Sequence, residues 1–200
     1  MTALNEKAVL ISVSTKSWRA TIKNKQATCD LAADKGTTEE WVNVTQRIVP
    51  KAVVQEPQRI AAACKNYLRG DSPGAFDGEY LRGGLPLWDK NVHILPNGLS
   101  EKLLRNLGAF QEQFNEAVEN VRKVLPNALR QAAIENPELA PQIAVPDVDY
   151  ICEEKYGLDW ELNIMPSSND IRIDSSKEFA AEVKRSIEEK ANRKLKEVTD

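Results

Sequence analysis

An apolar stripe at heptad spacing is the clearest pattern along the chain. Steps of four and three residues alternate through seven positions, namely Leu103, Leu107, Phe110, Phe114, Ala117, Val121 and Val124. This alternation places the seven side chains along one seam of a helix. Ser100 is a good helix cap and Pro126 is poorly tolerated inside a helix. The pattern therefore predicts a long amphipathic helix over about 100–125, followed by a kink or a turn into a second helix over 127–135.

Several short segments have the patterns of strands. Residues 8–14 are apolar and β-branched, which is typical of a buried strand. Residues 159–164 alternate polar and apolar positions, as a half-buried strand does. We expect a further short strand at 92–95, an extended segment from Trp41 to Val49, and an antiparallel partner for 159–164 at 171–173.

Between the first strand and the extended segment, the sequence predicts a helix. Ser14 or Thr15 is expected to cap it, and Gly36 to end it. Trp18 and Ile22 are four residues apart and would share one of its faces.

Three further helices are expected. One short helix would have Pro57 in its first turn and present Ile60, Ala63, Cys64, Tyr67 and Leu68. Asp147 is expected to cap a short helix that ends at Gly157. A closing helix within 175–200 would carry Phe179, Val183 and Ile187 on its apolar side.

Residues 70–91 form the least regular part of the sequence, because glycine and proline recur there. The segment also contains Leu85, Leu87 and Trp88, so it is not a free linker. A loop with that much apolar surface either folds back on the core or binds something. We expect these three side chains to form a protein interface, together with the apolar side of the closing helix.

These elements predict an α+β fold that is mainly helical. A helical hairpin containing the long helix would lie beside a small, mostly antiparallel sheet built from the first strand and the Trp160 region. We expect one domain over 1–174, with 175–200 as a C-terminal amphipathic helix or assembly arm.

Composition changes this picture in two ways. The longest apolar runs are far too short to span a bilayer, and three scattered cysteines are typical of a reducing cytosol. Charge is divided unevenly: residues 1–70 hold eleven Lys and Arg against six Asp and Glu, a balance of +5, whereas residues 71–200 hold sixteen against twenty-four, a balance of −8. A basic first third would suit an anionic polymer or head-to-tail docking onto another copy.

No pattern in the sequence indicates an active site. The chain has one histidine, His93, and its cysteines lack the pair spacing of metal ligands. Neither a phosphate-binding P-loop nor a Gly-x-Gly-x-x-Gly turn occurs. We therefore expect no catalytic residue, no metal and no cofactor.

The basic third contains a candidate nucleic-acid site. Four cations surround one indole within ten residues: Lys16, Trp18, Arg19, Lys23 and Lys25. Single-strand binding uses this combination, since cations follow the phosphates and the indole stacks on bases. The alternative is that Trp18 and Ile22 face the core while the charges are solvated.

The order of motifs after residue 45 resembles that of a known group of proteins. A Gly-rich segment leads to a Pro96-Asn97-Gly98 turn and a long helix with Phe110 and Phe114. A Tyr156-Gly157 helix end, the strand 160–164, a proline and Asp170-Ile171 then follow. This order resembles uncharacterised small proteins of bacteriophages and integrative or mobile elements, over roughly residues 45–174. The resemblance implies action in a bacterial cytoplasm and transfers no catalytic residues.

Together these observations predict a non-catalytic phage or mobile-element protein that acts through protein–protein contacts. It would form a homo-oligomer or bind a host or phage protein. The alternative is a single-stranded nucleic-acid-binding or annealing protein that uses the basic N-terminal third.

Overall fold

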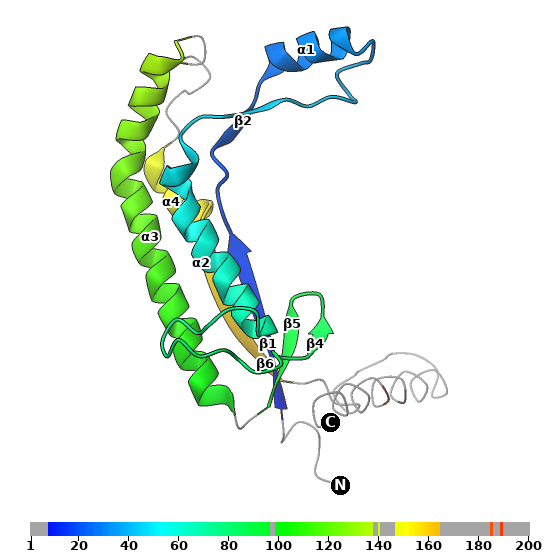
Figure 1. The fold of residues 1–200 in the computed structure, drawn as a ribbon, viewed down its shortest axis with the longest axis vertical. Coiled ribbons are helices and arrows are strands. Elements are labelled where there is room, and N and C mark those ends of the chain that lie inside the picture. Colours follow the sequence, from blue (N-terminus) through cyan, green and yellow to red (C-terminus); the bar gives the residue numbers. More distant parts are fainter. Residues whose placement is uncertain are drawn as a thin grey trace, which may run out of the picture. The chain divides into compact units, whose positions relative to one another are not determined.

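The computed structural model describes residues 8–96, 99–137, 140, 147–164, 185 and 189. Within these residues the chain has an α+β fold with four helices and six strands (Figure 1). The chain divides into two compact units. Unit 1 draws on Met1–Ser14, Ala61–Glu112 and Leu158–Asp200, and unit 2 on Thr15–Ile60 and Gln113–Gly157.

The sheet of unit 1 has four strands in the order β4-β5-β1-β6. Their bounds are β1 Ala8–Lys16, β4 Leu87–Asp89, β5 Val92–Pro96 and β6 Gly157–Ile164. β1 pairs antiparallel with β5, with Leu10 opposite Ile94, and β4 pairs antiparallel with β5. The strands predicted at 8–14, 92–95 and 159–164 are thus confirmed, as is a small sheet that joins the first strand to the Trp160 region.

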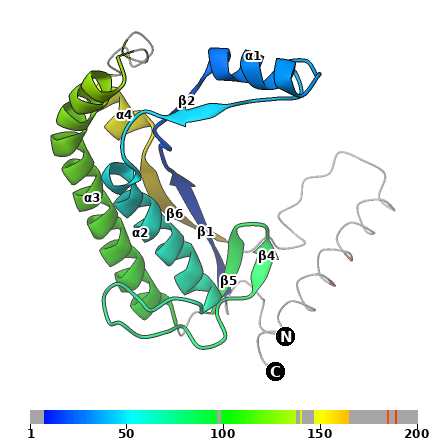
Figure 2. The same ribbon diagram turned by 45° about the horizontal axis from the view of Figure 1, so that its top comes forward.

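Two helices cover this unit with apolar side chains. The second half of α2 (Lys51–Arg69) lies beside the first part of α3 (Ser100–Glu135) in Figures 1 and 2. The rings of Tyr67 and Phe110 are 5.8 Å apart between centroids. Leu68, Leu103 and Leu107 are fully buried. Burial of large side chains of this kind is the main source of folding free energy.

The irregular segment after α2 folds back on unit 1. Leu81 and Leu85 are buried, and the backbone N–H of Leu85 donates to the carbonyl of Leu68 at 2.6 Å. Trp88 packs against the Leu10–Ile94 cluster of the sheet. Leu85, which the sequence assigned to a protein interface, is thus buried in unit 1, and its place in an interface stays a prediction.

Unit 2 contains a two-stranded ribbon and two short helices. The ribbon consists of β2 (Thr21–Lys23) and β3 (Thr45–Arg47), and the helices are α1 (Lys25–Asp34) and α4 (Val148–Glu154). The predicted extended segment up to Val49 is thus a strand only in its centre.

The helix predicted from Ser14 or Thr15 starts too early. β1 continues to Lys16, β2 follows, and α1 begins at Lys25 with Asn24 as its cap. The reason is a long-range pairing: Ile22 lies opposite Gln46, so the backbone of this segment bonds to a distant strand instead of to its own next turn. The predicted end is confirmed, since α1 stops at Asp34 and Gly36 has a φ of +62°.

Both long helices contain a proline in their interior. Pro57 lies inside α2, which begins at Lys51, so the prediction of Pro57 in a first turn is wrong. α3 continues through Pro126 to Glu135, so a separate second helix over 127–135 is also wrong. Leu125 and Leu129, on either side of Pro126, are buried. This packing offsets the backbone hydrogen bond that proline removes.

The heptad residues of α3 are buried with one exception. Val124 is half exposed, while the other six have at most 5% of their surface exposed. Asp147 caps α4 as predicted, because its Oδ1 accepts from the N–H groups of Asp149 and Tyr150. The helix ends at Glu154, and Gly157 already belongs to β6. The predictions for 171–173 and for the closing helix lie outside the described residues. Of the helices that the structure describes, none has the length and apolar character needed to cross a membrane.

Candidate nucleic-acid interface

The β2–β3 ribbon presents one polar face to solvent. Thr21 lies opposite Arg47, and Lys23 lies opposite Thr45. Residues that are directly opposed in an antiparallel pair share a face, and all four of these are exposed. Ile22 and Gln46 are half-buried on the other face. Lys23 and Arg47 therefore project from the same exposed face.

Backbone contacts extend the ribbon at both ends. The N–H of Ile48 donates to the carbonyl of Ala20 at 2.9 Å, and the N–H of Asn24 donates to the carbonyl of Val44 at the same distance. Ala20 is fully buried and has a φ of 53°, a left-handed conformation that is uncommon outside glycine. This turn redirects the chain from β1 into β2 and so positions the basic segment.

Thr28 joins α1 to the end of the ribbon, where β2 leads into α1 (Figure 2). Its hydroxyl donates to the carbonyl of Asn24 at 2.7 Å and accepts from the N–H of Val44 at 3.1 Å. Thr28 is 1% exposed, so both of these bonds are shielded from water. The helix and the ribbon therefore form one local structure.

Five cations surround this structure and remain accessible: Lys16, Arg19, Lys23, Lys25 and Arg47. Among the described residues none of the five forms an ion pair with a carboxylate. Arg47 donates through Nη1 to the carbonyl of Arg19 at 3.4 Å, so these two residues lie together. The sequence singled out four of them, and the strand register adds Arg47.

Trp18 and Trp41 both belong to the segment Thr15–Ile60 of unit 2, and they differ in exposure. Trp18 is half-buried, and its carbonyl accepts from Nε2 of Gln58 at 2.8 Å, which holds this stretch against α2. Trp41 is 83% exposed in the loop between α1 and β3. The sequence pointed to Trp18 as the stacking residue, but the structure leaves Trp41 as the accessible indole.

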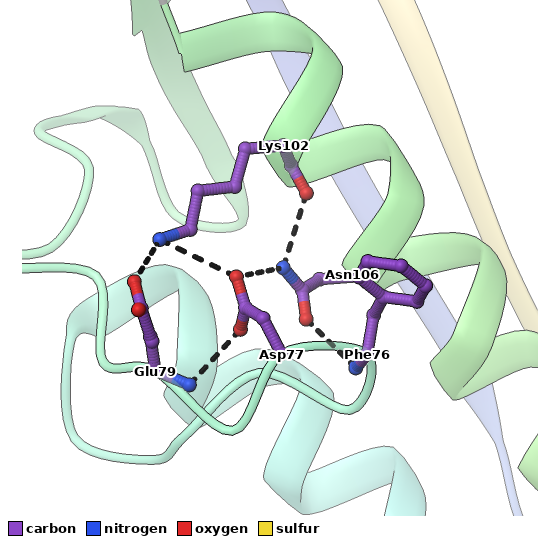
Figure 3. Close-up of polar contacts among 5 residues, drawn as sticks. All are labelled: Phe76, Asp77, Glu79, Lys102 and Asn106. Carbon is purple, nitrogen blue, oxygen red and sulfur yellow. Dashed lines mark hydrogen bonds and ion pairs between the residues drawn. The ribbon is translucent and has the colours of Figure 1, made fainter.

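A separate cluster of polar side chains lies in unit 1 (Figure 3). Asn106 is fully buried; its Oδ1 accepts from the N–H of Phe76 at 2.9 Å, and its Nδ2 donates to Asp77 and to the carbonyl of Lys102. Lys102 pairs with both Asp77 and Glu79. The bond to the Lys102 carbonyl lies within α3, and the other contacts fasten the 70–84 loop to that helix. No sequence pattern predicted this cluster, since nothing in the spacing of these residues links the loop to the helix.

His93 belongs to the core of unit 1. It is 5% exposed, and its Nδ1 lies 3.0 Å from the carbonyl of Leu85. Burial lowers the pKa of His93 below its ordinary value, so the ring is neutral at physiological pH. A neutral imidazole that bonds to a backbone carbonyl is a structural histidine.

The three cysteines are held in the thiol form. Burial raises the pKa of Cys64 to about 12, and burial also raises the pKa of Cys152. The Cys29 thiol donates to Oε1 of Glu39 at 3.0 Å, and this bond raises the pKa of Cys29. Thiols in such surroundings are poor nucleophiles. In the described part of the chain, no group of three His, Cys, Asp or Glu side chains lies together as metal ligands would.

Of the expected protein interface, one side chain stays accessible in the described residues. Leu87 is 45% exposed, Leu85 is buried and Trp88 packs on the sheet. Phe179, Val183 and Ile187 lie outside the described residues.

Unit 2 has an apolar groove of about 360 Å³ between α2 and α3. It is lined by Ala52, Val53, Glu56, Ala117, Asn120, Val121 and Val124. Val124, the last residue of the heptad stripe, is the exposed apolar residue of α3 in this lining.

Comparison of the chain with protein-family models, with curated proteins and with solved structures gives no match in any of the three.

Proposed function

We propose that this chain is a non-catalytic protein that binds nucleic acid through the basic face of unit 2. By basic face we mean the β2–β3 ribbon with the five cations on and beside it. The observation that carries the proposal is that these cations are exposed and free of carboxylate partners within the described residues.

Phosphate binding explains this arrangement better than a role in folding does. Exposed charges contribute little to stability, so the ribbon has no need of five cations. A cation that already neutralises a carboxylate must give up that partner before it binds phosphate. Among the residues that the structure describes, the five cations of the basic face have no such partner. Each phosphate contact releases a condensed counterion.

The experiment compares two double variants with equal changes in charge. Lys23→Glu with Arg47→Glu reverses two charges on the exposed ribbon face. Arg82→Glu with Lys90→Glu reverses two exposed charges in unit 1 and serves as the matched control. Binding of a fluorescent oligonucleotide is followed by anisotropy over a range of salt concentrations.

We expect binding by the wild type to weaken steeply with salt, by about 0.7–0.9 log units per phosphate contact and per tenfold increase in salt. The ribbon variant should lose roughly tenfold or more in affinity, while the control retains most of it. Equal losses in both variants would show non-specific attraction, and no binding at any salt concentration would refute the proposal.

A second candidate function is self-association, favoured by the apolar groove between α2 and α3. Val124 lines the groove, whereas Ile134 lies on the same helix, is 71% exposed and does not line it. If a second copy covers the groove, Val124→Lys lowers the mass measured by light scattering and Ile134→Lys does not. A monomeric wild type at micromolar concentration would remove this candidate.

The place of action follows from the resemblance to phage and mobile-element proteins. We infer action in a bacterial cytoplasm, where three unpaired cysteines remain reduced. Fractionation of cells that express the tagged chain tests this inference, and recovery in the membrane or the medium would contradict it.

A further inference from the structure

Trp41 is the most exposed of the large hydrophobic side chains in the described residues. It exposes 83% of its surface, against 71% for Ile134 and 63% for Phe76. A solvated indole is unfavourable, because aromatic rings gain most from being covered. Because Trp41 lies next to the basic face, a ligand bound to that face would also cover the indole.

The loop that carries Trp41 is tied to the basic face. The N–H of Trp41 donates to the carbonyl of Thr38 at 3.1 Å, and the N–H of Thr37 donates to the carbonyl of Ala32 in α1 at 2.9 Å. Val44, three residues further on, bonds to both Asn24 and Thr28. Three extended residues span at most about 11 Å, so Trp41 lies at the end of the ribbon.

The residues directly before Trp41 are negatively charged, so the role of Trp41 differs from that of the five cations. Glu39 and Glu40 precede it directly and are exposed. Carboxylates repel phosphates, so the nucleic-acid backbone would follow the ribbon and approach Trp41 with a base instead of a phosphate.

From these observations we propose that the basic face binds single-stranded nucleic acid and that Trp41 stacks on an unpaired base. The inference rests on the proposed function and adds the class of ligand. In a duplex the faces of the bases are already stacked, whereas a single strand offers them to an exposed indole. Cations next to an accessible aromatic ring are the combination that binds single strands.

The test measures affinity for an oligothymidylate of roughly 20 nucleotides, longer than the 4–16 nucleotides that one single-strand-binding fold covers, and for a duplex of the same length. Trp41→Ala should weaken binding of the single strand by roughly tenfold or more and leave duplex binding unchanged. Trp41→Phe should restore most of the loss, because phenylalanine keeps an aromatic face. The slope of affinity against salt should stay that of the wild type, since no phosphate contact is removed.

Two controls accompany these variants. Phe76→Ala removes an exposed ring of unit 1 and should leave binding unchanged. Thermal unfolding of Trp41→Ala should match that of the wild type, because the indole is mostly solvated in the folded chain.

The outcomes separate this inference from the proposed function. Binding of both ligands with no effect of Trp41→Ala overturns the stacking role and leaves the basic face intact. A lower mass of Trp41→Ala in light scattering, with equal losses for single strand and duplex, also overturns it and assigns Trp41 to a contact between copies. Absence of binding to either ligand refutes the proposed function itself.

Discussion

The side-chain amide of Asn24 donates a hydrogen bond to Oε1 of Gln46 at 2.7 Å. The Oδ1 atom of the same asparagine accepts from the N–H of Ala27 at 3.0 Å, which caps α1. One residue therefore fixes both the start of the helix and its attachment to β3. Together with the two hydrogen bonds of Thr28, this pair holds α1 against the ribbon.

Replacing Asn24 should destabilise unit 2. Asn24→Ala removes a helix cap, which contributes about 1 kcal/mol, and one further hydrogen bond, which contributes about 0.5–1.5 kcal/mol. Asn24→Asp keeps a capping oxygen, and Gln46 can turn its amide to donate to the new carboxylate. We expect urea unfolding to show a loss of about 1.5–2.5 kcal/mol for Asn24→Ala and near wild-type stability for Asn24→Asp.

Gln46→Ala completes a double-mutant cycle with Asn24→Ala. If the two side chains interact as the structure shows, the double variant loses less than the sum of the single losses. Simple additivity would mean that the contact contributes nothing to stability.

Gly84 and Gly83 should respond differently to alanine. Both have a positive φ, +65° and +75°, which makes any side chain unfavourable. A Cβ at Gly84 would in addition overlap the backbone carbonyl group of Arg69, whereas a Cβ at Gly83 would meet nothing within 4 Å. We expect Gly83→Ala to cost about 1 kcal/mol and Gly84→Ala clearly more, measured by thermal unfolding.

Equal losses at the two positions would show that conformation alone decides the cost. A larger loss at Gly84 would confirm the close approach of the 70–84 loop to the end of α2.

Local sequence patterns were sufficient to predict the long or strongly apolar elements. The heptad stripe of α3 repeats over many residues, and β1 is a continuous apolar and β-branched run, so both elements were predicted. β2 has three residues, and its pairing with β3 depends on a partner more than twenty positions away. A pattern of three residues has no measurable period, so the sequence favoured a helix that begins at Ser14 or Thr15.

The predictions based on Pro57 and Pro126 were wrong for a different reason. The rule that excludes proline from helix interiors considers only the backbone, whereas Pro57 is buried and Pro126 is flanked by buried leucines. Tertiary packing outweighs the local loss at both positions.

The assignment of residues 1–174 to a single domain stays a prediction.

The candidate site was found in part. Four of the five cations lie within ten residues of sequence, so the sequence alone indicated a basic segment: Lys16, Arg19, Lys23 and Lys25. Arg47 joins them only through the register of β2 and β3. The exposure of Trp41 depends on how the loop after α1 turns, and no sequence pattern encoded that turn.

Asn106 should be among the residues least tolerant of substitution in unit 1. Asn106→Leu keeps a similar volume but leaves the N–H of Phe76 without its partner and removes one of the hydrogen bonds that the carboxylate of Asp77 accepts. An unpartnered buried polar group costs about 1–3 kcal/mol, and a lost hydrogen bond about 0.5–1.5 kcal/mol. We expect urea unfolding to show a loss of roughly 2–4 kcal/mol, whereas Asn115→Ala, at an exposed position of α3, should change stability by less than about 0.5 kcal/mol.

A loss below about 1 kcal/mol at Asn106 would contradict this view of the cluster. Limited proteolysis adds an independent measurement, because release of the 70–84 loop should expose new cleavage sites in Asn106→Leu and none in Asn115→Ala.

The Asp77 carboxylate should make the stability of unit 1 depend on pH in acid. It accepts from the N–H of Glu79 at 2.9 Å, from Nδ2 of Asn106 and from the ammonium of Lys102. The bond from Glu79, with those from Asn106 and Lys102, holds the pKa of Asp77 below its ordinary value of 3.8. Because the pKa is lower in the folded chain than in the unfolded one, ionised Asp77 stabilises the fold above pH 3.8. That contribution disappears as the pH falls through the folded pKa.

Asp77→Asn isolates this contribution. The difference in unfolding free energy between the wild type and Asp77→Asn should be constant near neutral pH and should narrow below pH 3.8. Asp34→Asn removes an exposed carboxylate of α1 and controls for the change in net charge. A difference for Asp77→Asn that stays constant from neutral pH into strong acid would mean that the folded chain does not favour ionised Asp77. The loop would then be held by Asn106 and by the ion pair between Lys102 and Glu79.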